Sequence, residues 1–139
     1  MTPELVWLTL SALLAASLWI PYIVGVNTEP TTDDTAVAFR RPPDLRTMRP
    51  WVHRSWRAHQ NLLETLIPFA AVVLIANMAG VSTQVTIWAT IAFFWLRVAH
   101  AAGMISGLAG FPVRPIIFTA SWLCTIAIGV QLLVGAPSL

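Results

Sequence analysis

The uncharged stretch Thr65–Leu96 limits this chain to folds that a lipid bilayer can surround. One spanning helix needs about 20 apolar residues, so the stretch is long enough for two. The segment Asn77–Gln84 inside it has the residues of a turn. The whole chain is 57% hydrophobic and 10% charged, whereas soluble domains are about 25% charged. We therefore expect an integral membrane protein rather than a soluble domain, a disordered chain or a nucleic-acid-binding protein.

The apolar segments predict a single all-α domain over residues 1–139, an integral membrane four-helix bundle. Its expected spans are Leu5–Val26, Trp56–Met78, Val85–Ser106 and Ile116–Val134. The first span could be mistaken for a signal peptide. Residues 1–4 carry no positive charge, however, and no small-residue cleavage motif follows the span, so we expect this helix to be retained.

The loop at residues 27–55 is polar, broken by four prolines, and holds five of the eight arginines. Arg114 lies in the third loop, whereas the second loop and both ends have no basic residue. The positive-inside rule therefore places loops one and three in the cytoplasm and both termini outside. Most of the arginines in loop 27–55 are expected to face anionic headgroups, although a part in ligand entry stays open.

Three ionisable residues fall within or close to the spans: Glu64, Arg97 and His100. Charges at such positions are costly and are candidates for function. Arg57, Asn61 and Glu64 recur at i, i+4 and i+7, which places them within about 60° on one helix face. The simplest arrangement pairs Glu64 with Arg97 across two helices, with Asn61 bridging both.

These polar residues leave two interpretations open. They could form a structural girdle that fixes helix register, or a cleft for an anionic ligand with carboxylates and an amine, since Arg binds carboxylates bidentately. No metal site is expected, because His59 and His100 lack a ligand-type spacing and no carboxylate cluster accompanies them. The single cysteine, Cys124, lies in an apolar run and excludes an intrachain disulfide.

Three motifs resemble the MAPEG family, the membrane-associated proteins of eicosanoid and glutathione metabolism. The segment Arg57–Phe69 carries the pattern R-A-H-x-N-x-x-E-T-x-x-P-F. Leu96–His100 is similar to the family's third-helix motif, and Pro112–Arg114 is a weaker match. The resemblance in order, spacing and four-helix layout covers nearly the whole chain.

The resemblance implies a homotrimer in a bacterial inner membrane that binds glutathione between neighbouring subunits near the cytoplasmic side. Arg114 matches the arginine that favours the glutathione thiolate in catalytic members. The positions that bind glutathione or brace its site are Arg57, Asn61, Glu64, Arg97 and His100. The implied activity is a glutathione-dependent transferase or peroxidase acting on a lipophilic electrophile from the bilayer.

Two departures from the family pattern leave the enzymatic activity open. Met104 stands where several members have Tyr, and Pro115 follows Arg114 where the prostaglandin-synthase branch has Ser. Neither side chain can donate a hydrogen bond to sulfur. One alternative is a non-catalytic relative that binds a thiol or lipid, or serves as a small subunit of a larger membrane complex. Another is a proton-coupled exporter that uses Glu64.

Overall fold

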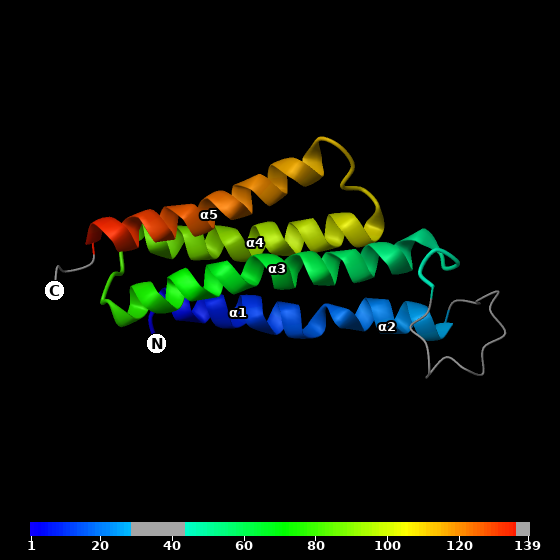
Figure 1. Cartoon of the computed structure of the whole chain (residues 1–139), viewed down its shortest axis with the longest axis horizontal. Coiled ribbons are helices and arrows are strands. Elements are labelled where there is room, and N and C mark those ends of the chain that lie inside the picture. The colour runs from blue at the N-terminus through cyan, green and yellow to red at the C-terminus, as the bar shows by residue number, and fades with distance from the viewer. Residues whose placement is uncertain (29–43, 136–139) are drawn as a thin grey trace.

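The computed structural model describes residues 1–28 and 44–135, and these residues form helices and no strand. The helices are α1 (Pro3–Ser17), α2 (Trp19–Thr28), α3 (Pro50–Met78), α4 (Gln84–Ser106) and α5 (Val113–Gly135). α2 continues α1, so the chain forms four rods of alternating direction (Figure 1). Each rod is long and apolar enough to cross a membrane. The predicted all-α, four-span architecture is therefore confirmed.

The first rod is interrupted at Leu18, between α1 and α2. Pro21 lies four residues after Ser17, so it has no N–H to donate to the Ser17 carbonyl, and its ring crowds that oxygen. The Leu18 N–H still donates to the carbonyls of Leu14 (2.9 Å) and Ala15 (3.4 Å). The interruption is therefore local, and the rod continues through it.

A buried polar cluster joins the rods at the end where α1 begins. The Glu4 carboxylate accepts hydrogen bonds from the hydroxyls of Ser82 (2.8 Å) and Thr86 (2.6 Å) at its Oε1 atom. Thr83 caps α4 and donates through its hydroxyl to Gln131 of α5 (3.1 Å). The cluster thus fixes the turn between α3 and α4 against both α1 and α5.

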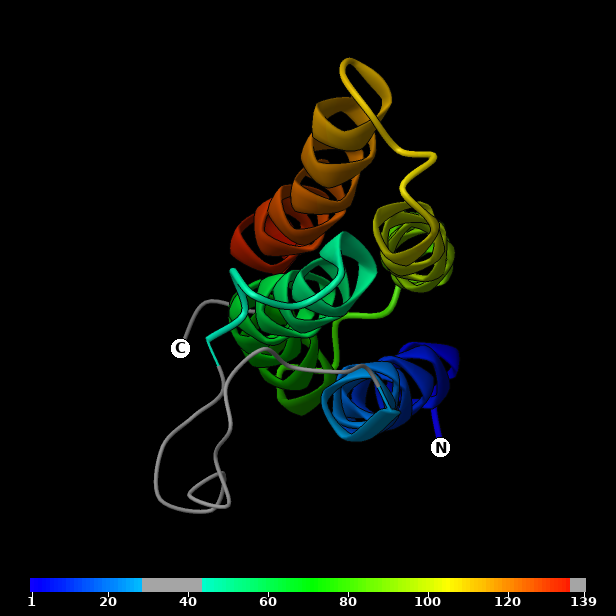
Figure 2. The same ribbon diagram turned by 90° about the vertical axis from the view of Figure 1, so that its right-hand side faces the viewer.

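The apolar core fills the space between the first three rods and only part of α5. Phe69 of α3 stacks on Phe93 of α4, with ring centroids 3.6 Å apart. In α5 the buried residues are Ser121 and Ile128, both beyond its first two turns. The first turns of α5 therefore have few packing partners in the chain. Figures 1 and 2 show α5 tilting away from α4 toward the loop that joins them.

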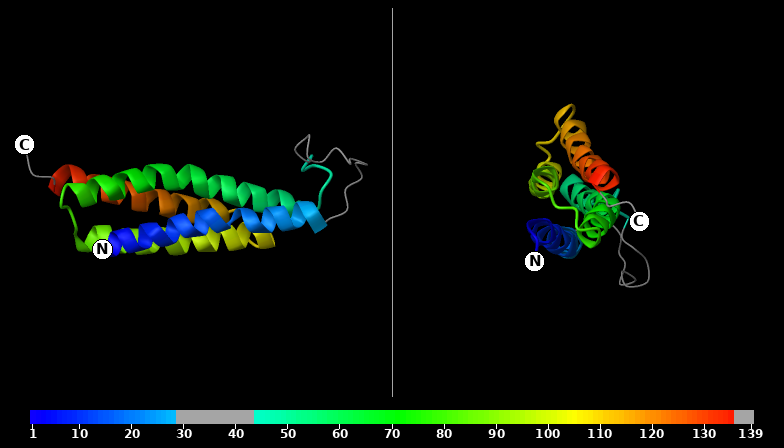
Figure 3. Two further views of the ribbon diagram at one scale, coloured as in Figure 1. Left: turned by 90° about the horizontal axis from the view of Figure 1, so that it is seen from below. Right: turned by 90° about the vertical axis from the view of Figure 1, so that its left-hand side faces the viewer.

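α1 begins and α5 ends at the same end of the bundle, where the polar cluster of Glu4 is found (Figure 3). The opposite end holds the start of α3, the end of α4 and the start of α5 (Figure 1). Large apolar side chains cover much of the outer surface, among them Ile67, Trp88, Trp95 and Leu133. Such a surface suits contact with lipid.

Two of the predicted boundaries are wrong. α3 begins at Pro50 rather than at residue 56, and α5 begins at Val113 rather than at 116. Hydropathy marks where a helix enters the apolar region, whereas both helices start earlier, in polar sequence, with proline tolerated in the first turn. Arg114 and Pro115 therefore belong to the first turn of α5. Two of the arginines expected to set topology, Arg40 and Arg41, lie outside the described residues.

Candidate functional site

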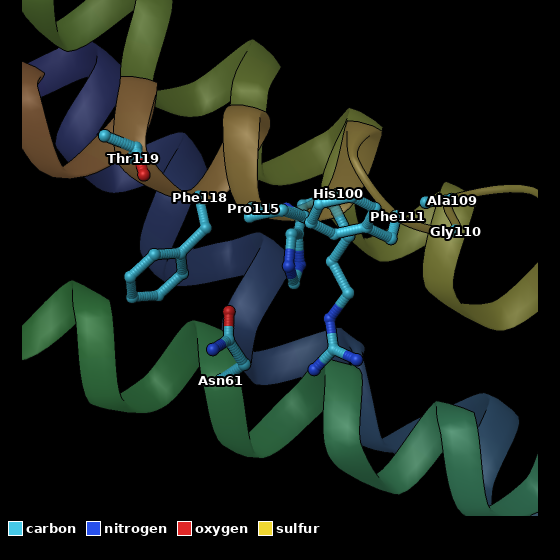
Figure 4. A pocket seen from close by; sticks show the side chains of 9 residues that line it. Asn61, His100, Ala109, Gly110, Phe111, Pro115, Phe118 and Thr119 are labelled. Carbon is cyan, nitrogen blue, oxygen red and sulfur yellow. The ribbon is translucent and has the colours of Figure 1, made fainter.

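A cleft of about 530 Å³ opens where α5 diverges from the bundle. Asn61 of α3 lies on one side and α5 on the other, with the α4–α5 loop closing the end (Figure 4). The residues that line it are Asn61, His100, Ala109, Gly110, Phe111, Arg114, Pro115, Phe118 and Thr119. Of the six residues predicted for the site, the cleft brings together Asn61, His100 and Arg114.

Arg97 lies beneath the cleft and holds Asn61 in place. Its side chain is 1% exposed. Its Nη2 atom donates to Asn61 Oδ1 over 2.6 Å, and its Nη1 atom donates to Ser121 Oγ over 3.1 Å. The Phe118 ring lies 5.9 Å from the guanidinium carbon. Because a buried guanidinium needs acceptors, these contacts tie three helices together at the floor of the cleft.

His100 follows Arg97 by three residues and lines the cleft directly. Its side chain is almost fully buried, and the described chain offers its ring no hydrogen bond. It lies near the positive charges of Arg97 and Arg114. An imidazole without a protein partner at the wall of a cleft can hydrogen-bond to a ligand.

Arg114 is the exposed cation of the cleft. Its backbone N–H donates to the Gly110 carbonyl (3.1 Å), which fixes the first turn of α5 against the preceding loop. Within residues 1–28 and 44–135 its guanidinium has no acidic partner. Arg114 therefore presents a positive charge, next to a helix N-terminus, to whatever occupies the cleft.

Arg57 and Glu64 lie outside this cleft. Both are exposed, and the Arg57 guanidinium carbon sits 5.9 Å from the Trp56 ring. The predicted Glu64–Arg97 ion pair is wrong within the single chain, because Arg97 is buried and donates to Asn61 and Ser121 instead. Glu64 is about 60° around the helix from Asn61, and this rotation is enough to leave Glu64 exposed while Asn61 contacts Arg97 of α4.

The two residues that depart from the family pattern occupy different surroundings. Met104 is buried in the core with Ala15, Leu18 and Leu62, and does not line the cleft. Pro115 does line it. The hydroxyl that the cleft does contain belongs to Thr119, one turn further along α5.

Arg54 falls within the loop expected at residues 27–55. It lies in α3, and its Nε and Nη2 atoms each donate to the Ile105 carbonyl over 3.3 Å. That carbonyl belongs to the last turn of α4, next to the loop that closes the cleft. Its spacing of three residues before Arg57 was the available signal, because it places both side chains on one helix face.

Together, the fold and the cleft define a class: a small multi-pass membrane protein with four spanning helices and a cationic, partly apolar cleft at one end. The sequence model of the MAPEG family matches residues 5–134, and the chain belongs to this family. Membership supports, in general terms, a membrane function related to glutathione or eicosanoid metabolism. No curated protein matches the chain. Among the described residues, no group of three His, Cys, Asp or Glu side chains is placed to hold a metal ion.

Proposed function

We propose that the protein is a glutathione-dependent membrane transferase or peroxidase that acts on a lipophilic electrophile. The observation that carries this proposal is the position of Arg114, a cation without an acidic partner in the described chain, at the wall of a 530 Å³ cleft. A cation placed in this way stabilises an anion beside it. The family's connection with glutathione makes a thiolate the candidate anion.

Glutathione supplies a thiol that reacts as the thiolate, either attacking an electrophile or reducing a peroxide. Arg114 would favour the thiolate over the neutral thiol, because a nearby positive charge lowers the pKa of a thiol. Asn61 and His100 would hydrogen-bond to the peptide. Arg97 does not line the cleft, so its part is to hold the Asn61 amide through the 2.6 Å hydrogen bond.

The other face of the cleft suits an apolar co-substrate. Phe111, Pro115 and Phe118 line it, and Phe111 is 92% exposed. The first turns of α5 diverge from the bundle (Figures 1 and 2), which would leave a path from the bilayer to Arg114. A lipophilic electrophile dissolved in the membrane would reach the thiolate along this path.

A homotrimer would complete the site. Glutathione carries two carboxylates and one ammonium group, whereas the cleft of one chain presents a single exposed arginine. Arg57 and Glu64 face outward on α3, where a neighbouring copy would cover them. An arginine for a carboxylate and a carboxylate for the ammonium are the charges that the single-chain cleft lacks.

We place the protein in a bacterial inner membrane, with the end that holds the cleft facing the cytoplasm. The six described arginines lie in α3, α4, α5 and the segment before α3, at or toward this end. An excess of arginine in connecting segments marks the cytoplasmic side. Glutathione, a water-soluble tripeptide, would enter from that side.

A difference ultraviolet spectrum of the purified protein with glutathione tests the proposal. We expect thiolate absorbance at neutral pH, with S-methyl glutathione as the reference that has no thiol. Arg114→Ala should lose the signal, and Arg114→Lys should keep part of it because the charge remains. An undiminished thiolate signal in Arg114→Ala, with helix content unchanged by circular dichroism, would refute the assignment.

The burial of Met104 and the place of Pro115 in the cleft favour a second candidate, a non-catalytic relative that binds a thiol or lipid or serves as a small subunit. Neither residue provides a hydroxyl at the cleft. Calorimetry separates the candidates: glutathione that binds without a thiolate signal supports a binding protein. A protein partner that co-purifies in a stoichiometric amount supports a role as a small subunit of a larger membrane complex.

A further inference from the structure

A second cavity, of about 570 Å³, lies at the start of α3 and shares no lining residue with the cleft. It is lined by Asp44, Leu45, Arg46, Met48, Pro50, His53 and Trp56. We propose that this headgroup pocket binds a phospholipid whose headgroup carries both a phosphate and a primary ammonium group, as phosphatidylethanolamine does.

The headgroup pocket lies at the depth where lipid headgroups are found. Pro50 is the first residue of a candidate spanning helix, and the pocket extends from six residues before it to Trp56 after it. Trp side chains favour this interfacial region. The ligand that this part of the protein meets at the highest concentration is therefore a lipid headgroup.

One part of the pocket is suited to a phosphate. Arg46 and His53 both line it, and the described chain provides no hydrogen-bond or ion-pair partner for either side chain. His53 makes a ring contact with Trp56, at 6.1 Å between centroids. The N-terminus of α3 has no side-chain cap, so its partial positive charge adds to that of Arg46.

Asp44 brings a negative charge to the same pocket. Its Oδ1 atom accepts a hydrogen bond from the Arg46 backbone N–H (3.0 Å), and its carbonyl accepts from the Thr47 N–H (3.1 Å). This turn fixes Asp44 and Arg46 beside one another, yet their side chains form no ion pair. Two opposite charges that face one cavity without pairing are complementary to a zwitterion.

The apolar part of the lining distinguishes a lipid from a soluble phosphate. Leu45, Met48, Pro50 and Trp56 form this part, and Met48 is itself buried. A free phosphate or phosphoethanolamine would leave the accessible parts of Leu45, Pro50 and Trp56 uncovered, whereas the glycerol and upper acyl chain of a lipid would cover them. The apolar wall therefore favours the lipid over its soluble headgroup.

Native mass spectrometry of the detergent-purified protein, titrated with single lipids, tests the inference. The wild type should bind phosphatidylethanolamine more tightly than phosphatidylcholine, whose bulky quaternary ammonium cannot donate a hydrogen bond to Asp44. Asp44→Asn should remove this preference. Arg46→Gln should weaken the binding of both lipids by about 2- to 5-fold, as expected for an exposed charge pair. Both variants should keep the thiolate signal of the cleft. A failure of the lipid proposal can therefore be distinguished from a failure of the proposed glutathione function.

Glu64→Gln is the matched control, since Glu64 is an exposed charge on α3 outside the pocket. Its lipid binding should equal that of the wild type. Equal binding of phosphatidylethanolamine, phosphatidylcholine and phosphatidylglycerol would overturn the inference, as would an Arg46→Gln variant that behaves like Glu64→Gln. Displacement of the lipid by free phosphoethanolamine at matched concentration would show a soluble-phosphate site instead.

Discussion

Arg97 donates a 2.6 Å hydrogen bond to Asn61 Oδ1, so the buried guanidinium is matched by a neutral amide rather than by a carboxylate. A second hydrogen bond to Ser121 also involves a neutral acceptor. Within the described chain, no carboxylate offsets the positive charge of Arg97 beneath the cleft. That charge adds to the charge of Arg114 and favours an anionic occupant of the cleft.

Asn61→Ala should destabilise the fold because it removes the acceptor of Arg97 Nη2. Leaving a buried donor without its partner costs about 1–3 kcal/mol. Thermal unfolding in detergent, followed by circular dichroism, measures this loss. Asn61→Asp should unfold at the wild-type temperature or above, because it keeps the acceptor and adds a charge.

Gln60 provides the control for Asn61. It is the adjacent amide on α3 and makes no side-chain hydrogen bond in the described chain. Gln60→Ala should stay within about 0.5 kcal/mol of the wild type, as for most surface substitutions. Equal loss of stability in Gln60→Ala and Asn61→Ala would show that the Arg97 contact is not the cause.

The spans could be predicted from the sequence because apolar runs and turn residues alternate along it. Bilayer thickness fixes the length of a spanning helix, so the positions and the number of the helices followed directly from the apolar runs. The interruption at Leu18 and the early starts of α3 and α5 depend on backbone hydrogen bonds, which hydropathy does not record. Glu4 was missed as a buried residue because its hydroxyl donors are distant in sequence: Ser82 lies in the turn between α3 and α4, and Thr86 in the first turn of α4.

The candidate site could be predicted in part. The helical spacing of Arg57, Asn61 and Glu64 predicted one shared face, but only Asn61 lines the cleft, and Arg57 and Glu64 lie outside it. The predicted span directions did bring the start of α3 and the end of α4 to the same end. Which of these three side chains reaches Arg97 depends on the rotation of α3 about its own axis. The packing of Leu62 and Phe69 determines that rotation. The sequence carries no direct signal for that rotation.

Gly107→Ala should disturb the wall of the cleft. Gly107 has φ = 84°, and an added Cβ would lie 3.2 Å from the Arg54 guanidinium carbon. The left-handed conformation alone costs an L-residue about 1–2 kcal/mol. Arg54 would then lose its hydrogen bonds to the Ile105 carbonyl, and the loop from Gly107 to Phe111 would move. Weaker binding of glutathione, measured by calorimetry, is the expected result.

Gly80→Ala is the matched control for Gly107, because Gly80 also has a positive φ (70°), a Cβ there meets no atom within 4 Å, and it does not line the cleft. Arg54→Gln should reproduce the effect of Gly107→Ala on binding while leaving the backbone unstrained. If Arg54→Gln binds glutathione like the wild type, the contact between Arg54 and Ile105 does not position the loop.

Thr86→Val should destabilise the end of the bundle opposite to the cleft. It removes the 2.6 Å hydrogen bond to Glu4 Oε1, and the second carboxylate oxygen, Oε2, is already buried without a partner. The capping box at the start of α4 is lost as well. We expect a loss of about 1–3 kcal/mol, as for other buried hydrogen bonds to a charge.

Thr9→Val provides the comparison for Thr86. The Thr9 hydroxyl donates to a carbonyl of its own helix and is exposed, so its removal should have little effect on thermal unfolding. Thr86→Val in a Glu4→Gln background should cost less than in the wild type, because the uncharged amide needs its donor less. Additive losses in the two variants would argue against a direct coupling of Thr86 with Glu4.

Glu64→Gln tests whether a neighbouring subunit completes the site. Within one chain Glu64 is exposed and has no partner among the described residues, so the substitution should leave the stability of the monomer fold unchanged. In the proposed homotrimer, Glu64 lies against the glutathione ammonium group bound with the next copy. Losing that charge should weaken glutathione binding about 10-fold, which corresponds to about 1.4 kcal/mol.

Arg57→Gln should weaken glutathione binding similarly, whereas His59→Gln, on the other side of α3, should not. Calorimetry on protein whose trimeric mass is established by native mass spectrometry gives the result. Wild-type affinity in both Glu64→Gln and Arg57→Gln would confine glutathione binding to the cleft of a single chain.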